Sequence, residues 1–225
     1  MEASTEIQSI LMELATHRKS HFPVKLPNME NTEWEVKNFE IDEHDVFMAN
    51  LRAMRDGNHF LCAEPGKYVA LIKKCNERGE RETVMSNTQL EYRTNIDFVN
   101  RAAGRLLITG LGLGMILRPL AVKPEVTSIT VIEKSDSLID MMRPYVKHIP
   151  KLSIVEGDAF TLDWPRNKAA GKPFDMAWHD IWSSFGGHEL LAEYAKMKRK
   201  WKPFVYGEQK CWAEDLTRRE LRRRY

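Results

Sequence analysis

Four short apolar runs in the second half of the chain each end in residues that can bind a ligand or move a proton. These residues are Gly110-Leu-Gly112-Leu-Gly114, Glu133, Asp158 and His179-Asp180. A glycine turn lets backbone N–H groups contact a ligand without a Cβ in the way. A carboxylate accepts hydrogen bonds from hydroxyl or amino groups, and it can also take a proton from a reacting group. The pattern therefore indicates a site for a polar ligand with a base beside it.

Glu133 favours a ribose as part of that ligand. It lies about 20 positions past the glycine turn at the end of the second run, where an acid can accept both ribose hydroxyls. A dinucleotide turn of the form G-x-G-x-x-G needs a third glycine at position 115, where the chain has Met115. Nicotinamide binding is therefore disfavoured, and a turn that binds no ligand stays open as the alternative.

His179 and Asp180 end the run FDMAWHDIW. Unpaired polar side chains are costly inside a strand core, by a few kcal/mol each. Either these residues face a cleft and act as a base, or His179 only points into the neighbouring helix and forms hydrogen bonds there. Trp182 has the same two interpretations, as the wall of an acceptor pocket or as core packing.

The spacing of the four runs predicts the sheet that positions these residues. The runs span residues 106–110, 128–133, 152–158 and 174–180, and helix-like segments separate them. Such a pattern is typical of a parallel sheet with helices on both faces, and ligands bind beyond the carboxyl ends of its strands. We therefore expect an α/β, Rossmann-like, doubly wound fold. A helix at 188–201, a fifth strand at 202–212 and a charged helical tail complete it.

The first 85 residues predict a smaller α+β extension. We expect a helix at 3–17, a linker, a strand at 34–41, a helix at 42–57 and a strand at 67–75. A helix at 86–104 then leads into the first strand of the main sheet. The predicted domains are therefore an N-terminal extension, 1–85, and a Rossmann-like ligand-binding domain, 86–225.

Composition excludes several other classes of protein. The 34 basic and 32 acidic residues give a net charge of +2, so nucleic acid is only a minor candidate partner, suggested by the tail RRELRRRY. The three cysteines are far apart and form no CxxC pair, so we expect no disulfide framework, no metal and a reducing cytoplasmic location. No apolar run approaches the roughly 20 residues of a membrane span, and the N-terminus is unlike a signal peptide.

The runs LLITGLGLGM, VIEKS, VEGDAF and FDMAWHDIW resemble motifs of the class I S-adenosylmethionine-dependent methyltransferases. Within that superfamily they are most similar to the spermidine-synthase-like branch and to small phage and bacterial methyltransferase-like proteins, over about residues 85–205. The resemblance implies S-adenosylmethionine, or its decarboxylated form, as cofactor. The implied cofactor contacts are Gly110, Gly112 and Gly114 at the amino-acid part, Glu133 at the ribose, and Asp158 with the Ala159 N–H at the adenine.

The resemblance also implies which residues face the acceptor substrate. Asp180 and His179 occupy the catalytic position after the fourth strand, and Trp182 stands close to them in the sequence. The start of the helix that carries Thr88 and Glu91 is expected to lie over the cofactor. These three residues, Trp182, Thr88 and Glu91, are the predicted substrate contacts.

Three functions follow from these observations. The first is methyl transfer to an acceptor, for which a small molecule is expected. The second is aminopropyl transfer, as in spermidine synthases, whose fourth strand ends in two aspartates within three residues; Asp180 matches the first, whereas Ser183 stands at the second. The third is a non-catalytic protein that binds the cofactor and regulates a partner. The family's C-terminal strand hairpin is shortened or absent, and the exposed sheet edge that results predicts a homodimer.

Overall fold

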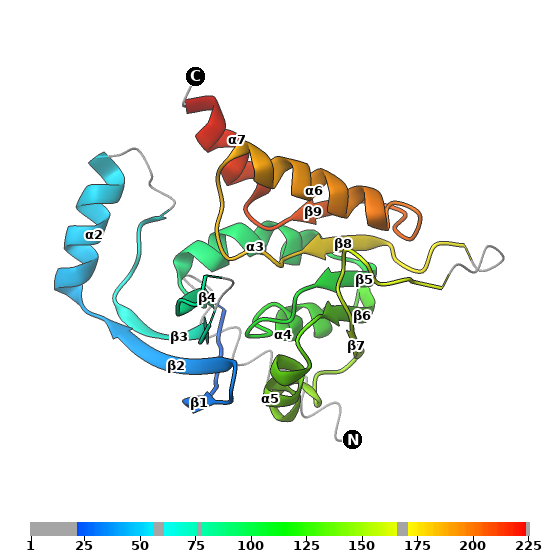
Figure 1. Cartoon of the computed structure of the whole chain (residues 1–225), viewed down its shortest axis with the longest axis horizontal. Coiled ribbons are helices and arrows are strands. Elements are labelled where there is room, and N and C mark those ends of the chain that lie inside the picture. The colour runs from blue at the N-terminus through cyan, green and yellow to red at the C-terminus, as the bar shows by residue number, and fades with distance from the viewer. Residues whose placement is uncertain (1–21, 56–60, 76–77, 166–170, 224–225) are drawn as a thin grey trace.

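The computed structural model describes residues 22–55, 61–75, 78–165 and 171–223, which form a four-stranded and a five-stranded sheet with their helices (Figure 1). The helix predicted at 3–17 lies outside these residues. Within the described part of the chain, no helix is both long and apolar enough to cross a membrane.

The five-stranded sheet is parallel throughout, and its strands stand in the order β7-β6-β5-β8-β9. The strands are β5 (Gly104–Thr109), β6 (Val126–Glu133), β7 (Leu152–Glu156), β8 (Met176–His179) and β9 (Gln209–Cys211). The chain starts in the centre at β5, moves outward to β7, and then crosses back to β8 on the other side. The strand order therefore reverses between β5 and β8, which is where doubly wound folds bind ligands.

Helices cover both faces of this sheet. They are α3 (Gln89–Arg101), α4 (Leu117–Ala121), α5 (Asp136–Val146), α6 (His188–Trp201) and α7 (Glu214–Arg223). Leu106 and Ile108 of β5 pack in one cluster with residues of α3, α4 and α5, whereas Leu107 packs in a second cluster with Met197 and Trp201 of α6. Alternate residues of one strand thus pack into the hydrophobic cores on the two faces of the sheet. This arrangement confirms the predicted Rossmann-like, doubly wound fold.

The N-terminal sheet is antiparallel and has the order β1-β2-β3-β4. Its strands are β1 (Met29–Glu30), β2 (Trp34–Ile41), β3 (Gly66–Lys73) and β4 (Glu82–Ser86), and α2 (Glu43–Arg55) connects β2 with β3. Strands β1 and β4 were not predicted, because β1 is very short and β4 lies among polar residues. The predicted linker was therefore wrong at β1, which pairs with β2.

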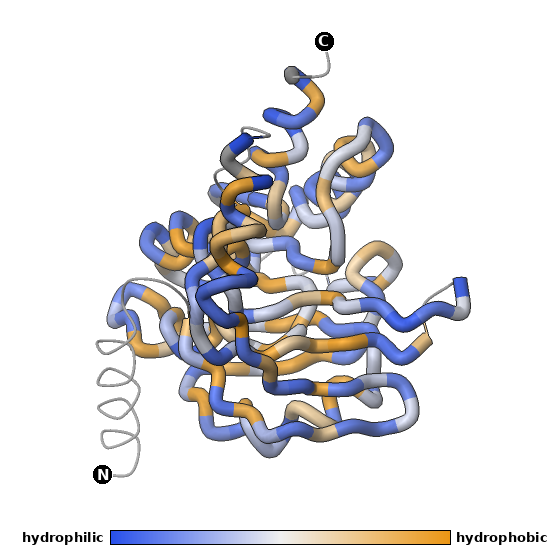
Figure 2. The backbone as a smooth tube through the Cα atoms, turned by 90° about the vertical axis from the view of Figure 1, so that its left-hand side faces the viewer, coloured by the Kyte–Doolittle hydropathy of each residue, from blue (hydrophilic) through white to orange (hydrophobic). Residues whose placement is uncertain are grey.

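The two sheets share one hydrophobic core. Trp34, Val36 and Leu71 of the N-terminal sheet belong to the same cluster as Phe98 of α3 and Leu106 of β5. The apolar stretches concentrate along the central strands in Figure 2. The predicted boundary after residue 85 therefore falls at the last residue of β4, between two sheets that pack against each other, and the division into domains stays a prediction.

The fifth strand is shorter than predicted. We expected 202–212, but only Gln209–Cys211 form β9. The chain turns after α6, where the N–H groups of Phe204 and Val205 bond to the carbonyl of Trp201, and both side chains are buried. Helix α7 follows β9, and the described residues add no further strand at this edge.

Candidate functional site

A cavity of about 390 Å³ lies at the carboxyl ends of the strands β5, β6, β7 and β8. Its lining includes Gly110, Gly112, Glu133, Asp158 and Asp180. The structure therefore brings polar residues from all four strand ends into one hollow, although they are up to 70 positions apart in the sequence. The strand order places them along one edge in the order β7, β6, β5 and β8.

The glycine turn needs glycine for its backbone shape. Gly110, Gly112 and Gly114 have φ angles of 95°, 50° and 64°, which L side chains rarely adopt. A Cβ on Gly110 would lie 1.9 Å from the backbone oxygen of Asp180. Gly114 does not line the cavity and packs instead near Leu117 of α4.

Glu133 both faces the cavity and shapes the turn. Its Oε2 accepts a hydrogen bond of 2.8 Å from the N–H of Leu111, and its Oε1 accepts one of 2.9 Å from the N–H of Ser135. A carboxylate offers about four acceptor sites, so two bonds leave room for ribose hydroxyls. The sequence indicated the ligand role, but it gave no signal for the bond to the turn.

Asp158 and Ala159 occupy different surroundings. Asp158 is exposed at the cavity, and its Oδ1 accepts a hydrogen bond of 2.7 Å from the N–H of Phe160. Ala159 is buried, does not line the cavity, and its carbonyl accepts a bond of 3.0 Å from the indole of Trp201. Of this predicted adenine pair, only Asp158 therefore stands at the cavity, and Phe160 joins it there.

Asp180 and Glu91 are two carboxyls in the same cavity. Burial raises the pKa of Asp180 to about 7. Burial, and then the negative charge of Asp180, raise the pKa of Glu91 well above its usual range. The indole of Trp212 donates a 2.8 Å hydrogen bond to Glu91 Oε2 and fixes its orientation. A carboxyl that titrates near neutral pH is well matched to proton transfer.

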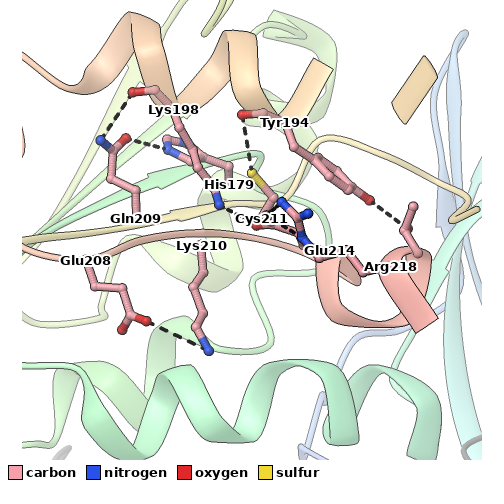
Figure 3. Close-up of polar contacts among 10 residues, drawn as sticks. His179, Tyr194, Lys198, Glu208, Gln209, Lys210, Cys211, Glu214 and Arg218 are labelled. Atoms are coloured by element: carbon pink, nitrogen blue, oxygen red, sulfur yellow. Dashed lines mark hydrogen bonds and ion pairs between the residues drawn. The ribbon is translucent and has the colours of Figure 1, made fainter. Parts of the chain in front are cut away.

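His179 lies outside the cavity. Its side chain is completely buried, and its Nδ1 lies 3.2 Å from Thr109 Oγ1. Its Nε2 lies 3.1 Å from Gln209 Oε1 (Figure 3). Burial lowers the pKa of His179 to about 4, so the ring is neutral at physiological pH. The geometry gives the predicted catalytic role no support; the ring is a core side chain, but its hydrogen-bond partners lie on strands β5 and β9 and not on the neighbouring helix that the alternative expected.

Of the three predicted substrate contacts, Glu91 and Trp182 line the cavity and Thr88 does not. Trp182 lines the cavity, its indole N–H donates a 2.6 Å bond to Glu193, and its ring packs edge-on against Tyr194 at 4.6 Å between centroids. Trp182 thus lines the cavity and also packs against the core, and its contact with an acceptor stays a prediction. Thr88 is absent from the lining, and its Oγ1 lies 3.0 Å from Ser86 Oγ.

The N-terminal sheet supplies a wall that the sequence did not predict. Its lining residues are Glu33, Trp34, Leu71, Lys73, Val84 and Met85. The indole of Trp34 donates a 2.9 Å hydrogen bond to Ser135 Oγ, which joins β2 to the loop after β6. A local sequence pattern cannot predict a contact between residues about 100 positions apart, because such a contact depends on how the two sheets pack.

The cavity carries more acidic than basic side chains. Its lining contains six carboxyls and two amines, namely Glu33, Glu91, Glu133, Asp136, Asp158, Asp180, Lys73 and Lys134. Such a lining attracts cations and repels anions. A positively charged ligand that also carries hydroxyl and amino groups suits this set of side chains.

No family model matches this chain, and neither does any curated protein. Similar solved structures include the 23S rRNA methyltransferase ErmE, with 18% identity and a TM-score of 0.37 over 53% of this chain and 45% of that one. The CcbJ methyltransferase from Streptomyces caelestis has 21% identity and a TM-score of 0.37 over 51% and 44%. Spermidine synthase from Thermotoga maritima has 16% and 0.35 over 61% and 49%. The chain spans about half the length of these structures, and at this level the likeness identifies no substrate.

Proposed function

We propose that the chain binds S-adenosylmethionine in this cavity and catalyses transfer of its methyl group to an acceptor. The observation that carries the proposal is the convergence of Gly110, Gly112, Glu133, Asp158 and Asp180 on one hollow. Three of these carry carboxyls, which suit the hydroxyls, the amino group and the positive charge of an adenosyl sulfonium.

The chain's own residues would divide the binding between them. Asp158 accepts a hydrogen bond from the adenine amine, and Glu133 accepts bonds from the ribose hydroxyls through the lone pairs that Leu111 and Ser135 leave open. When bound, the sulfonium supplies an electrophilic methyl group. The carboxyls of the lining also balance its positive charge in a partly closed cavity.

Asp180 is the proposed base. An acceptor attacks a sulfonium only through an unprotonated lone pair held in line with the leaving sulfur, so positioning and proton removal are the tasks left to the protein. The ionised carboxylate of Asp180 takes the acceptor's proton, and its pKa of about 7 keeps both protonation states accessible near neutral pH. Glu91 lies beside it, and the negative charge of ionised Asp180 helps to raise the pKa of Glu91, after burial.

One specific observation favours aminopropyl transfer as the second candidate. Ser183, which stands where spermidine synthases have their second aspartate, donates a hydrogen bond to the carboxylate of Glu82 in β4. Strand β4 thus provides a carboxylate beside Ser183, at the exposed surface and not in the cavity lining. Together with the acidic lining, this arrangement favours a cationic acceptor such as an amine.

The type of acceptor, the cellular location and the oligomeric state also remain proposals. A small-molecule acceptor is preferred to a nucleic acid, because the carboxylates of the lining other than Glu91 and Asp180 still outnumber its two lysines and would repel phosphate groups. We also propose a cytoplasmic location and a homodimer. The exposed side chains of Phe47, Met48 and Leu51 on α2 offer an apolar face, and light scattering across a range of protein concentrations tests whether the chain dimerises.

Isothermal titration with S-adenosylmethionine, decarboxylated S-adenosylmethionine and NAD tests the proposed function. We expect both adenosyl sulfonium ligands, and not NAD, to bind. Asp158→Ala should weaken both by about tenfold, the value of one charge-assisted hydrogen bond. Asp140→Ala, at an exposed carboxylate on α5 outside the lining, is the matched control and should bind as the wild type does. Binding of NAD alone, or of no adenosyl ligand, would refute the proposal.

A further inference from the structure

Met85 covers the glycine turn in a way that bears on which ligand the cavity accepts. Its Sδ accepts a hydrogen bond of 3.2 Å from the N–H of Leu113. A Cβ built on Gly112 would lie only 2.2 Å from the same sulfur. Met85 lines the cavity, so its thioether fills the space directly over the turn.

A β-bulge in β4 directs Met85 to this place. Leu71 pairs with Met85 and the next residue, Ile72, pairs with Thr83, so that Val84 is the extra residue of the bulge. In a regular strand consecutive side chains point to opposite faces, yet Val84 and Met85 both line the cavity. Bulges re-aim side chains in this manner and are frequent next to functional sites.

The strand order sets which part of an adenosyl ligand meets Met85. Asp158 on β7 and Glu133 on β6 come first along the cavity edge, followed by the glycine turn after β5 and by Asp180 after β8. With adenine at Asp158 and ribose at Glu133, the remaining chain of the ligand reaches the turn. In an acidic cavity, a ligand carboxylate needs N–H donors such as that turn provides.

We propose that Met85 is a specificity-determining residue that competes with the amino-acid end of the ligand for the glycine turn. This inference rests on the proposed function, since it assumes an adenosyl ligand. The thioether is an uncharged and weak acceptor, so a carboxylate can displace it from Leu113, but only by moving a packed side chain. A ligand with a carboxylate therefore binds only if Met85 moves, which weakens its affinity. An adenosyl thioether without an amino-acid end binds without moving Met85.

Titrations of two ligands against three proteins test the proposal. The ligands are S-adenosylmethionine and 5′-methylthioadenosine, which keeps the adenosine and lacks the amino-acid end. The proteins are the wild type, Met85→Ala and Val84→Ala; the last shortens a neighbouring side chain of the same lining. We expect Met85→Ala to bind S-adenosylmethionine about fivefold more tightly, the order of one weak hydrogen bond, with 5′-methylthioadenosine unchanged. Val84→Ala should leave the ratio of the two affinities as in the wild type.

The outcomes separate this inference from the proposed function. If neither ligand binds any of the three proteins, the proposed function fails, and the role of Met85 fails with it. If both ligands bind and Met85→Ala changes neither affinity, changes both alike, or weakens S-adenosylmethionine, only the role of Met85 is refuted. The same conclusion follows if Val84→Ala reproduces the effect.

A measurement on the wild type keeps the test independent of how the variants fold. With ¹³C-labelled methionine methyl groups, the Met85 resonance, assigned by comparison with Met85→Leu, should shift on addition of S-adenosylmethionine, because the side chain leaves the turn. It should keep its position with 5′-methylthioadenosine. A resonance that responds equally to both ligands would contradict the proposal.

Discussion

Asp180→Asn should change how stability depends on pH, because this carboxyl keeps its proton to unusually high pH in the folded protein. Burial raises the pKa of Asp180 to about 7 from its ordinary value of 3.8. Between these two pH values the unfolded chain has lost the proton while the folded chain still holds it. The wild type therefore loses stability as the pH rises from about 4 to about 7, and asparagine, which does not ionise, removes this loss.

The size of the effect follows from the pKa difference. The full difference corresponds to about 4 kcal/mol at about 1.4 kcal/mol per pH unit. The cavity leaves Asp180 partly accessible to water, which screens its charge, so we expect about half of that value, about 2 kcal/mol. Relative to the wild type, Asp180→Asn should thus gain about 2 kcal/mol between pH 4 and pH 8.

Urea unfolding of both proteins at pH 4, 5.5, 7 and 8 measures this difference. His179 ionises in the unfolded chain over part of the same range, but it is present in both proteins, and its contribution cancels in the comparison. Asp175→Asn is a control without this trend, because the guanidinium of Arg105 lowers the pKa of Asp175, so that its contribution to stability is lost only below about pH 4; this variant should be less stable than the wild type by a nearly constant amount at the four pH values. A difference between Asp180→Asn and the wild type that is constant with pH, or that falls as pH rises, would refute the reasoning.

Two further predictions concern the glycine turn. Glu133→Gln leaves only one acceptor oxygen for the N–H groups of Leu111 and Ser135. It should lower the free energy of unfolding by about 1–3 kcal/mol, the cost of one unpaired buried donor. An unchanged urea midpoint would show that these bonds contribute nothing to stability. Gly110→Ala places a Cβ 1.9 Å from the carbonyl of Asp180 at a φ of 95° and should cost about 3 kcal/mol or more. A melting temperature equal to that of the wild type would contradict the turn geometry.

The elements with strong periodic patterns were predictable from the sequence. The strand expected at 34–41 is β2 (Trp34–Ile41), and the helix expected at 188–201 is α6 (His188–Trp201). The buried residues Tyr194, Met197 and Trp201 of α6 repeat with the helical period, and the start of β2 alternates between buried and less buried residues, so the sequence carries the signal locally. The parallel sheet follows from the same reasoning, because continuous apolar runs separated by helices have few other stable arrangements.

The failures depend on interactions between distant parts of the chain. His179 ends its strand as a catalytic residue would, but Thr109 on β5 and Gln209 on β9 satisfy both ring nitrogens. The fifth strand is an exception with a local cause: the N–H groups of Phe204 and Val205 bond to the carbonyl of Trp201 in a turn, and only Gln209–Cys211 form β9. Nothing in the local sequence distinguishes a polar strand end that faces a cleft from one that meets a partner, because the partner comes from another element.

The glycine turn shows the same limit within the site itself. The sequence predicts its backbone donors, since glycines between an apolar run and a helix expose N–H groups. Whether a donor is available to a ligand depends on what packs over it, and here Met85 contacts the N–H of Leu113 from β4, a strand that the sequence did not predict. The bulge at Val84 makes that contact geometrically feasible, because it turns two consecutive side chains to one side. Under the proposed function, the preference of the site among adenosyl ligands would thus be encoded by Met85, outside the glycine turn.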